Sequence, residues 1–489
     1  ETSYEIQLRT AWHKAWIPIK ARTWSEMFKI DKTITLKPGT RSTPLIIDKG
    51  GKPGAYMLYT VRPGETTTID VANKHACCVK IKASRVIVRG LVLKGARQDG
   101  IKLGNVKDVV IERCDISGWG RQDPCGFGTW FDSGIKAVWP GLKRIVIQRN
   151  RIHHPRYDSN NWTEKGFYAR QPYHPFGPQA ISWMNNRGNH VIRYNHFYSD
   201  DAHRFTDAIG WGGDFSKKGF PGPDSDVYGN IVSDCWDDGL QIEGGGCNVR
   251  VWGNYIDKSM VGIATCACTV GPLYIFRNVF ARSQWADYPG GDTDALVLPG
   301  HFKPHGFPPT LNRGYFAKVG ETAKGGSGRQ YWFHNTMLQP TPPPGRKFTL
   351  GAQFGLQRVG HSRMITQLVS LNNIWHVCHT TDETLVDRIS IWPATDSRTN
   401  TFDYDIYNGI VKEAYRDAES HGIRAVPVYL KGHGPQVGSK GLYQLKPETP
   451  GHDAGKRIPN INDGFHGKAP DIGACETGGK PMEFGVDAY

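Results

Sequence analysis

A short phrase built around an asparagine recurs along the chain and constrains the fold more than any other feature. Alternating β-branched or aromatic residues are followed by Asn, one further residue and an apolar one. The Asn residues stand at Asn150, Asn195, Asn230, Asn254, Asn278, Asn335 and Asn373, and Cys114 takes the Asn place in an earlier copy. Successive Asn residues are 45, 35, 24, 24, 57 and 38 positions apart. Unequal spacings with a minimum of 24 indicate a solenoid in which some coils carry inserted loops.

The alternation within each copy has the period of a β-strand, and Asn between two short strands tolerates the left-handed conformation of a turn. Stacked Asn residues would hydrogen-bond along the axis as a ladder. A helical solenoid needs a 3.6-residue period, which is absent, and a propeller blade needs four strands, for which 24 residues are too few. We therefore predict an all-β, single-stranded parallel β-helix with long inserted loops, terminal caps and little α-helix.

A second phrase lies between the Asn turns and reads polar, small, aliphatic, any residue, apolar. Its copies begin at Asp99, Ser133, Gln179, Asp207, Asp238, Val261 and Asp294. We expect the third residue of each copy to point inward, which gives Ile101, Ile135, Ile181, Ile209, Leu240, Ile263 and Leu296. Strand parity places Lys102, Lys136, Gln241 and Glu243 outward and assigns Trp211 to the core.

Length and composition are compatible with one large domain. The 489 residues contain no Pro/Ser-rich linker, so we expect a cap over 1–30, coils over 31–476 and a tail over 477–489. No apolar run approaches the ~18 residues of a membrane span. A secreted or periplasmic location is expected. Among the ten cysteines, Cys114 with Cys125 and Cys235 with Cys247 are candidate disulfides, and stacked thiols in the core are the alternative.

The formal net charge of +14 is dispersed along the chain, which favours a polyanionic partner. Nucleic acid and acidic or sulfated glycans both have that charge. No helix-turn-helix, zinc-finger or aromatic RNA-binding phrase is present, so we predict an acidic polysaccharide as partner and no nucleic acid.

These phrases resemble those of the pectate-lyase-like superfamily of right-handed parallel β-helix proteins. Residues 34–40 are similar to its early coils, and residues 469–476 are similar to a common terminal phrase. The resemblance covers about residues 30–476 and implies the fold. It does not select a reaction, because hydrolases, lyases, epimerases and non-catalytic tailspikes share this architecture.

The densest group of carboxylates lies in the middle coils, between long insertions. Asp207 and Asp238 occupy the same place in successive copies of the second phrase. Because neighbouring parallel strands are ~4.8 Å apart, their carboxyl groups should approach closely. One carboxyl of such a pair has a raised pKa and can act as a proton donor beside an ionised partner. Glycosidases need such a pair, so Asp207 and Asp238 are the catalytic candidates, with Asp237 and Glu243 as substitutes.

A lyase would instead need a base for the C5 proton and a group that neutralises the uronate carboxyl. His203 and Arg204 are further catalytic candidates, with Tyr228, Lys258 and Arg277 also near these coils. Lyases of this fold often use Ca²⁺, which Asp237, Asp238 and Glu243 could hold; we predict no required metal, with Ca²⁺ as an option. The substrate-binding candidates are Lys102, Lys136, Trp139, Gln241, Lys258 and Arg277.

Only the paired Asp237-Asp238 resembles the polygalacturonase signature, and Gly432-His-Gly434 lies outside the repeats. We predict a secreted glycoside hydrolase that cleaves a sulfated or uronic-acid polysaccharide by carboxylate acid/base catalysis. The first alternative is a polysaccharide lyase acting by β-elimination on a uronic-acid polymer. The second is a non-catalytic glycan-binding β-helix.

Overall fold

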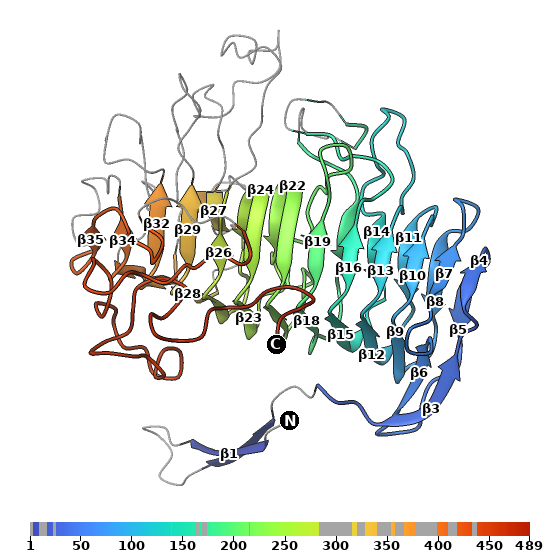
Figure 1. The fold of residues 1–489 in the computed structure, drawn as a ribbon, viewed down its shortest axis with the longest axis horizontal. Coiled ribbons are helices and arrows are strands. Elements are labelled where there is room, and N and C mark those ends of the chain that lie inside the picture. The colour runs from blue at the N-terminus through green and yellow to red at the C-terminus, as the bar shows by residue number, and fades with distance from the viewer. Residues whose placement is uncertain are drawn as a thin grey trace.

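The computed structural model describes the backbone of residues 3–8 and 17–22. It also describes residues 26–137, 139–161, 164, 166–168, 174–214, 216–282, 315–319, 328–339, 354–356, 366–377, 399–408, 418–432 and 438–489. Strands stack in parallel along one long axis, as Figure 1 shows from the blue to the orange end of the ribbon. No helix occurs among the described residues. The fold is the all-β parallel β-helix that the repeats predicted.

The strands that precede the Asn turns form a 12-stranded parallel sheet. Each strand pairs with its counterparts in the coils on either side, as between Val109, Ile145 and Val86. The strands are β3 (Ile30–Thr35), β6 (Tyr56–Thr60), β9 (Val86–Arg89), β12 (Lys107–Glu112), β15 (Lys143–Gln148), β18 (Val191–Arg193), β21 (Asp226–Tyr228), β23 (Val249–Trp252), β25 (Leu273–Phe276), β28 (Gln330–Phe333), β31 (Leu368–Leu371) and β33 (Thr401–Asp403).

The strands that follow the Asn turns form a second row. In two central coils the strand is long and runs on into the third row, which joins the two rows into a single 21-stranded sheet. The second row contains β4 (Gly39–Arg41), β7 (Thr67–Asp70), β10 (Val92–Lys94), β13 (Asp115–Ser117), β16 (Arg151–His153), β19 (His196–Tyr198), β22 (Ile231–Gln241), β24 (Tyr255–Ala264), β26 (Val279–Phe280), β29 (Thr336–Gln339), β32 (Ile374–Val377), β34 (Ile406–Tyr407) and β35 (Ile423–Arg424).

The third row carries the second phrase. Besides the ends of β22 and β24 it contains β5 (Leu45–Ile47), β8 (Cys77–Ile81), β11 (Asp99–Leu103), β14 (Ser133–Ala137), β17 (Gln179–Ser182), β20 (Ile209–Gly210), β27 (Tyr315–Val319) and β30 (Phe354–Leu356). The residues expected to point inward from 101 to 263 have no exposed surface, as predicted. The copy expected at Asp294 lies outside the described residues. The strand that pairs with β24 in this row is β27, with Ala264 beside Lys318.

The asparagine ladder is present and continuous. In each step the Oδ1 of one Asn accepts the backbone N–H and the side-chain Nδ2 of the Asn before it, at 3.0 Å and 3.0 Å between Asn195 and Asn230. The expectation that Asn itself adopts the left-handed conformation is wrong. The preceding residue does so, with φ of 55° at Arg149 and 54° at Tyr194, because the Asn side chain must point along the axis.

Two segments lie outside the coils. Strands β1 (Ser3–Leu8) and β2 (Ile17–Arg22) pair with each other as a separate antiparallel sheet, away from the first coil in Figure 1. After β35, residues 438–489 run back over the turns of earlier coils. Arg277 donates to the carbonyl of Ala474, and Arg149 donates to the carbonyl of Ala488. Figure 1 shows this red segment returning to the middle of the molecule.

The two candidate disulfides are not formed, since all nine cysteines in the described residues are free. Most of these thiols are buried, Cys114 and Cys235 among them, as the alternative of stacked core thiols expects. No helical segment in the described ranges has the length and apolar character of a membrane span.

Candidate functional site

The inserted loops rise from one side of the coils, above β14 to β22 in Figure 1, and enclose a pocket with a volume of about 240 Å³. Loops following β13, β16 and β20 form its walls with aromatic and carboxylate side chains. Its lining residues are Trp130, Phe131, His174, Pro175, Phe176, Thr206, Asp207, Gly212, Asp214, Asp237, Gln241, Glu243 and Lys318. Four of them carry carboxyl groups and one is a lysine. The pocket is therefore strongly acidic with a single cation among its described lining residues.

Asp207 and Asp238 lie in contact, as the repeat predicted. Ile209 pairs with Leu240, which stacks the start of one copy on the next. The backbone N–H of Asp238 donates to Asp207 Oδ1 at 3.0 Å, and Gln179 Nε2 donates to Asp207 Oδ2 at 2.9 Å. Asp207 is 4% exposed and Asp238 is fully buried. Burial, followed by the negative charge of Asp238, raises the pKa of Asp207 to about 7.

Lys318 stands beside this pair on β27. Its Nζ lies 2.7 Å from Asp238 Oδ2 and 3.3 Å from Glu243 Oε1, and only 8% of the residue is exposed. Burial alone would lower the pKa of Lys318, but Asp238 and Glu243 outweigh burial and raise the pKa well above its ordinary value. The lysine is thus protonated for as long as these carboxylates are ionised.

Asp237 and Glu243 are the next two carboxyl groups that line the pocket. His174 Nε2 lies 3.5 Å from Asp237 Oδ2, and Gln241 Nε2 donates to Glu243 Oε2 at 3.3 Å. Burial raises the pKa values of both carboxyl groups well above their ordinary range, and it lowers the pKa of His174 to about 4. Glu243 points outward from the coil into the pocket, as parity predicted, and is only 2% exposed because the surrounding loops cover it.

The oxygen atoms of three carboxylates converge. Ligand atoms from Asp207, Asp237 and Asp238 all lie within 4.8 Å of one another. Asp238 Oδ1 is buried and accepts no hydrogen bond from the described residues. Convergent carboxylate oxygens are the donors that Ca²⁺ prefers, and a divalent cation would offset negative charge that one lysine does not. The residues therefore fit a hard cation.

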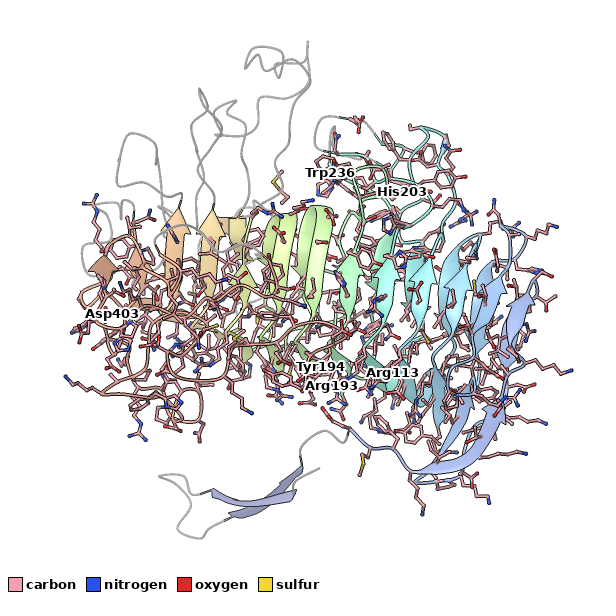
Figure 2. The ribbon with its side chains drawn as sticks, viewed as in Figure 1. Arg113, Arg193, Tyr194, His203, Trp236 and Asp403 are labelled. Carbon is pink, nitrogen blue, oxygen red and sulfur yellow. The ribbon has the colours of Figure 1, made fainter. Side chains whose placement is uncertain are left out.

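The candidates His203 and Arg204 lie in the loop after β19, outside the pocket lining. His203 Nδ1 is 2.8 Å from Asp200 Oδ1, and Arg204 pairs with Asp201 while its guanidinium lies 4.2 Å over the Trp236 ring. Figure 2 shows His203 and Trp236 on the loop-bearing side, whereas Arg193 and Tyr194 lie on the opposite side. Acidic residues of the same loop thus hold both candidates.

Three substrate-binding candidates and Tyr228 also lie away from the pocket. Arg277 is held by the carbonyl of Ala474 beneath the C-terminal segment, and Lys258 lies 3.5 Å from Asp234. Trp139 is 48% exposed on a turn beyond β14. Tyr228 stacks on Trp252 in the 12-stranded sheet, with ring centroids 4.2 Å apart. Sequence proximity to the central coils did not bring these side chains together, because the coil turns them onto other faces.

Gln241 lines the pocket, and Lys102 and Lys136 point outward from the same row, as predicted. The assignment of Trp211 to the core is wrong. Trp211 is partly exposed, and its ring stacks on Phe131 with centroids 4.8 Å apart. Strand β20 ends at Gly210, so the alternation that sets parity has already stopped there.

Lys318 is absent from the candidates predicted from sequence because β27 begins with Tyr315-Phe316 rather than with a polar and a small residue. The spacing to the ladder does not find it either. Gln241 and Ala264 precede the next ladder Asn by 13 and 14 positions, whereas Lys318 precedes Asn335 by 17, so counting back from Asn335 by the same interval ends beyond β27. His174 lies in a long insertion, which carries no such register.

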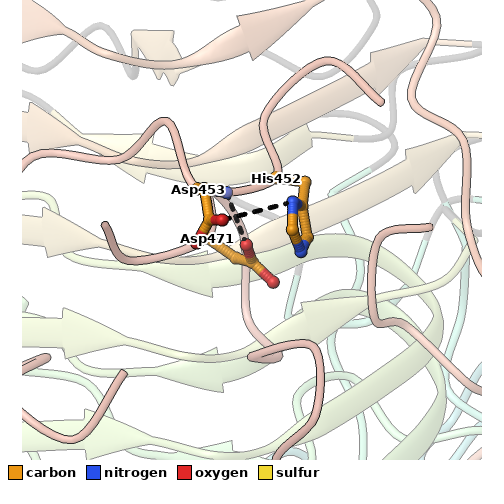
Figure 3. Close-up of side chains that lie close together, drawn as sticks. All are labelled: His452, Asp453 and Asp471. Carbon is orange, nitrogen blue, oxygen red and sulfur yellow. Dashed lines mark hydrogen bonds and ion pairs between the residues drawn. The ribbon is translucent and has the colours of Figure 1, made fainter. Parts of the chain in front are cut away.

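A second group of possible metal ligands, His452, Asp453 and Asp471, lies in the C-terminal segment (Figure 3). Its oxygens already accept backbone N–H groups. Asp471 Oδ1 accepts from Asp453 at 2.8 Å, and Asp453 Oδ1 accepts from Lys468 at 3.0 Å. These bonds fold the segment back on itself, which is a structural role.

Comparison with known proteins matches residues 65–280 to the family described as right handed beta helix region. The crystal structure of pectate lyase Pel9A is similar over 92% of this chain and 86% of its own, with 12% identity and a TM-score of 0.44. The Dettilon tailspike protein is similar over 74% of this chain and 62% of its own, with 16% identity and a TM-score of 0.36. The comparison with curated proteins gives no match. With its coils paired in parallel on both sides of the matched region, this chain is a right-handed parallel β-helix protein.

Proposed function

We propose that the protein is a polysaccharide lyase that acts on a uronic-acid polymer, with Lys318 as the general base. The observation that carries the proposal is the position of Lys318: its ammonium group is buried in the wall of the pocket, against the carboxylates of Asp238 and Glu243. Among the described residues that line the pocket, it is the one side chain whose neutral form is a strong base.

The carboxylates control whether Lys318 can act as that base. Asp207, Asp237 and Asp238 would hold Ca²⁺, which when bound neutralises the carboxylate of a uronate and so acidifies its C5 proton. Burial by itself disfavours the charged form of Lys318. A cation held by the three aspartates would offset the negative charge that keeps the lysine protonated, and would so favour the neutral form that accepts a proton.

The reaction balances without a further reagent. The neutral Nζ of Lys318 removes the C5 proton, the C–H electron pair forms the C4–C5 double bond, and the C4–O bond breaks. The departing sugar oxygen takes a proton from water, and the hydroxide that remains takes the proton from the Lys318 ammonium group, which restores the base. Gln241, whose Oε1 has no hydrogen-bond partner among the described residues, faces the pocket and can orient the sugar.

A glycoside hydrolase is the second candidate, and the pKa of Asp207 favours it. A carboxyl with a pKa of about 7 beside a second carboxyl is suited to protonate a leaving oxygen near neutral pH. Against it, the backbone N–H of Asp238 binds Asp207, and Lys318 holds Asp238. Both groups thus lie together in the floor, whereas a hydrolase needs them on opposite sides of a sugar.

The test is incubation with a panel of polyuronates and sulfated galactans while reducing ends and the absorbance of unsaturated uronate are followed. A lyase produces both signals, and they rise with added Ca²⁺ and disappear with a chelator. Lys318→Ala and Lys318→Arg should each lose at least about a hundredfold of the rate, since arginine keeps the charge but stays protonated. The matched control is Lys258→Ala, which removes a lysine outside the pocket.

Reducing ends without the unsaturated product would mean hydrolysis and overturn the lyase. In that case Asp207→Asn and Asp238→Asn should abolish cleavage. If the purified chain binds acidic glycans but cleaves none of the panel, a non-catalytic glycan-binding role replaces both enzymes.

A further inference from the structure

Three lysines lie in register on the outward face of the third row. Lys80 on β8 pairs with Lys102 on β11, which pairs with Lys136 on β14. Parallel neighbours are ~4.8 Å apart, and like charges in such positions repel. Only part of this charge is offset locally, where Lys102 Nζ lies 3.7 Å from Asp99 Oδ2. An uninterrupted column of cations on adjacent strands favours an elongated anion lying along the axis.

The last lysine of the column is fixed against aromatic rings. Lys136 Nζ donates to the carbonyl of Phe131 at 2.6 Å and lies 4.8 Å over the ring of Trp211. The ring of Phe131 stacks between Trp130, at 4.0 Å, and Trp211, at 4.8 Å between centroids. These rings are all partly exposed, so the stack presents a solvent-accessible aromatic wall.

The backbone holds this wall under strain. Phe131 has a φ of 63°, a conformation that bulky residues rarely adopt. Its carbonyl accepts the Ser133 hydroxyl as well as Lys136, which stabilises the conformation from two sides. Strained backbone conformations of this kind are concentrated at binding sites. There they point a side chain toward the ligand in a direction that an unstrained backbone would not allow.

The column leads into the pocket. Lys136 pairs with Ser182, and Ser182 pairs with Gly210. A Cβ at Gly210 would lie 2.2 Å from Gln241 Oε1, so Gln241 is the next outward side chain in the row. Ser182 and Gly210, which lie between Lys136 and Gln241 in this row, are small and buried, so neither projects a side chain from this face, while Trp130 and Phe131 form part of the pocket itself.

We propose that Phe131, Trp211 and Lys136 form a subsite for a sugar that carries an anionic group, and that Lys102 and Lys80 extend it along the axis. The aromatic faces receive the apolar face of the sugar, and the ammonium group of Lys136 receives its carboxylate or sulfate. The inference rests on the proposed function in placing this subsite beside the cleaved bond. The acidic polymer then runs from the pocket toward the N-terminal coils.

Binding measured by titration calorimetry tests the subsite separately from turnover. Lys318→Ala protein, which is expected not to cleave, is titrated with oligosaccharides of polygalacturonate, carrageenan and cellulose. Trp211→Ala and Lys136→Gln, each added to that background, should weaken binding of the acidic oligosaccharide by roughly tenfold. Lys136→Gln should also reduce the dependence of affinity on salt.

The matched controls are Trp139→Ala, an exposed tryptophan on a nearby turn, and Lys143→Gln, whose lysine pairs in register with Lys107 on the 12-stranded sheet. Both should bind within about twofold of the background. Trp211→Phe keeps an aromatic face and should retain most of the affinity, which separates loss of the aromatic ring from a folding defect. Preference for polygalacturonate identifies a carboxylate as the anion, and preference for carrageenan identifies a sulfate.

Unchanged affinity in Trp211→Ala and Lys136→Gln overturns the subsite, as does equal binding of the cellulose oligosaccharide. If native protein still cleaves a polyuronate with unsaturated product, the lyase stands while the subsite fails. If native protein cleaves nothing but the two variants lose binding, the subsite stands while the proposed reaction fails.

Discussion

Asp207 titrates in a range where its protonation also affects folding. Its pKa of about 7 in the folded protein exceeds the ordinary 3.8, so the folded state binds more protons between these values. Stability contributed by Asp207 is therefore full below pH 4 and is lost as pH rises toward 7, on the order of 2–4 kcal/mol. In metal-free protein, Asp207→Asn should flatten this decline, as measured by thermal unfolding from pH 4.5 to 8. A parallel decline in both proteins would contradict the assignment.

The same residues predict how a cation affects stability. Ca²⁺ binds ionised carboxylates, so it should raise the melting temperature more at pH 8 than at pH 5, where protons compete for Asp207 and Asp237. Asp238→Asn should remove most of the increase. Substitution of the exposed Asp463 to Asn is the control and should leave the increase intact, because Asp463 pairs only with surface groups near Arg457. No melting shift in native protein at either pH would count against a cation at this site.

Lys318 compensates charge that burial makes unfavourable. Lys318→Met should destabilise metal-free protein at pH 8 by about 3–5 kcal/mol, because Asp238 and Glu243 lose their cation in a buried setting. Adding Asp238→Asn should restore part of the loss, which a double-mutant cycle of denaturant unfolding measures. Additive losses in the double variant would show that the two residues do not interact.

At the scale of the element, each ladder Asn satisfies backbone groups in two coils. Asn254 Oδ1 accepts the backbone N–H of Asn230 at 3.1 Å, and its Nδ2 donates to the carbonyl of Val227 at 3.0 Å. Asn254→Ala leaves these buried groups without partners and should destabilise the protein by about 2–4 kcal/mol. Thr43→Ala, which removes an exposed bond from Arg41, should change stability by less than about 0.5 kcal/mol. Equal effects in denaturant unfolding would refute the role of the ladder.

At the scale of the whole molecule, the C-terminal segment ties distant coils together. Arg149 donates to the carbonyls of Val486 and Ala488, and Gly485 donates to the carbonyl of Gly229. Arg149→Ala should release the end of this segment to carboxypeptidase while global stability changes by less than about 1 kcal/mol. Arg62→Ala, in an exposed pair with Glu65, is the control and should be digested as slowly as native protein. An unchanged digestion rate in Arg149→Ala would refute this attachment.

The coil architecture followed from sequence because it depends on local periodicity. The spacing of Asn150 to Asn373 and the aliphatic third residues of the second phrase both report the strand register directly. The same register placed Asp207 on Asp238, since identical positions in successive coils must stack. Parity failed at Trp211, where the strand has already ended. It placed Glu243 outward correctly, but it could not predict that loops bury this side chain.

The sequence by itself determined the ladder, the two phrases and the stacked pair of aspartates, because neighbouring coils convert equal sequence positions into spatial contact. Only the tertiary structure decided which other groups share the pocket. Lys318 lies 80 residues after Asp238 in the sequence, and His174 belongs to an inserted loop that has no periodic pattern. Inserted loops have no register, so their side chains reach the site through packing that no repeat encodes. The chemistry of the pocket depends on Lys318 and on the inserted loops, since Lys318 supplies the cation and the loops bury the carboxylates.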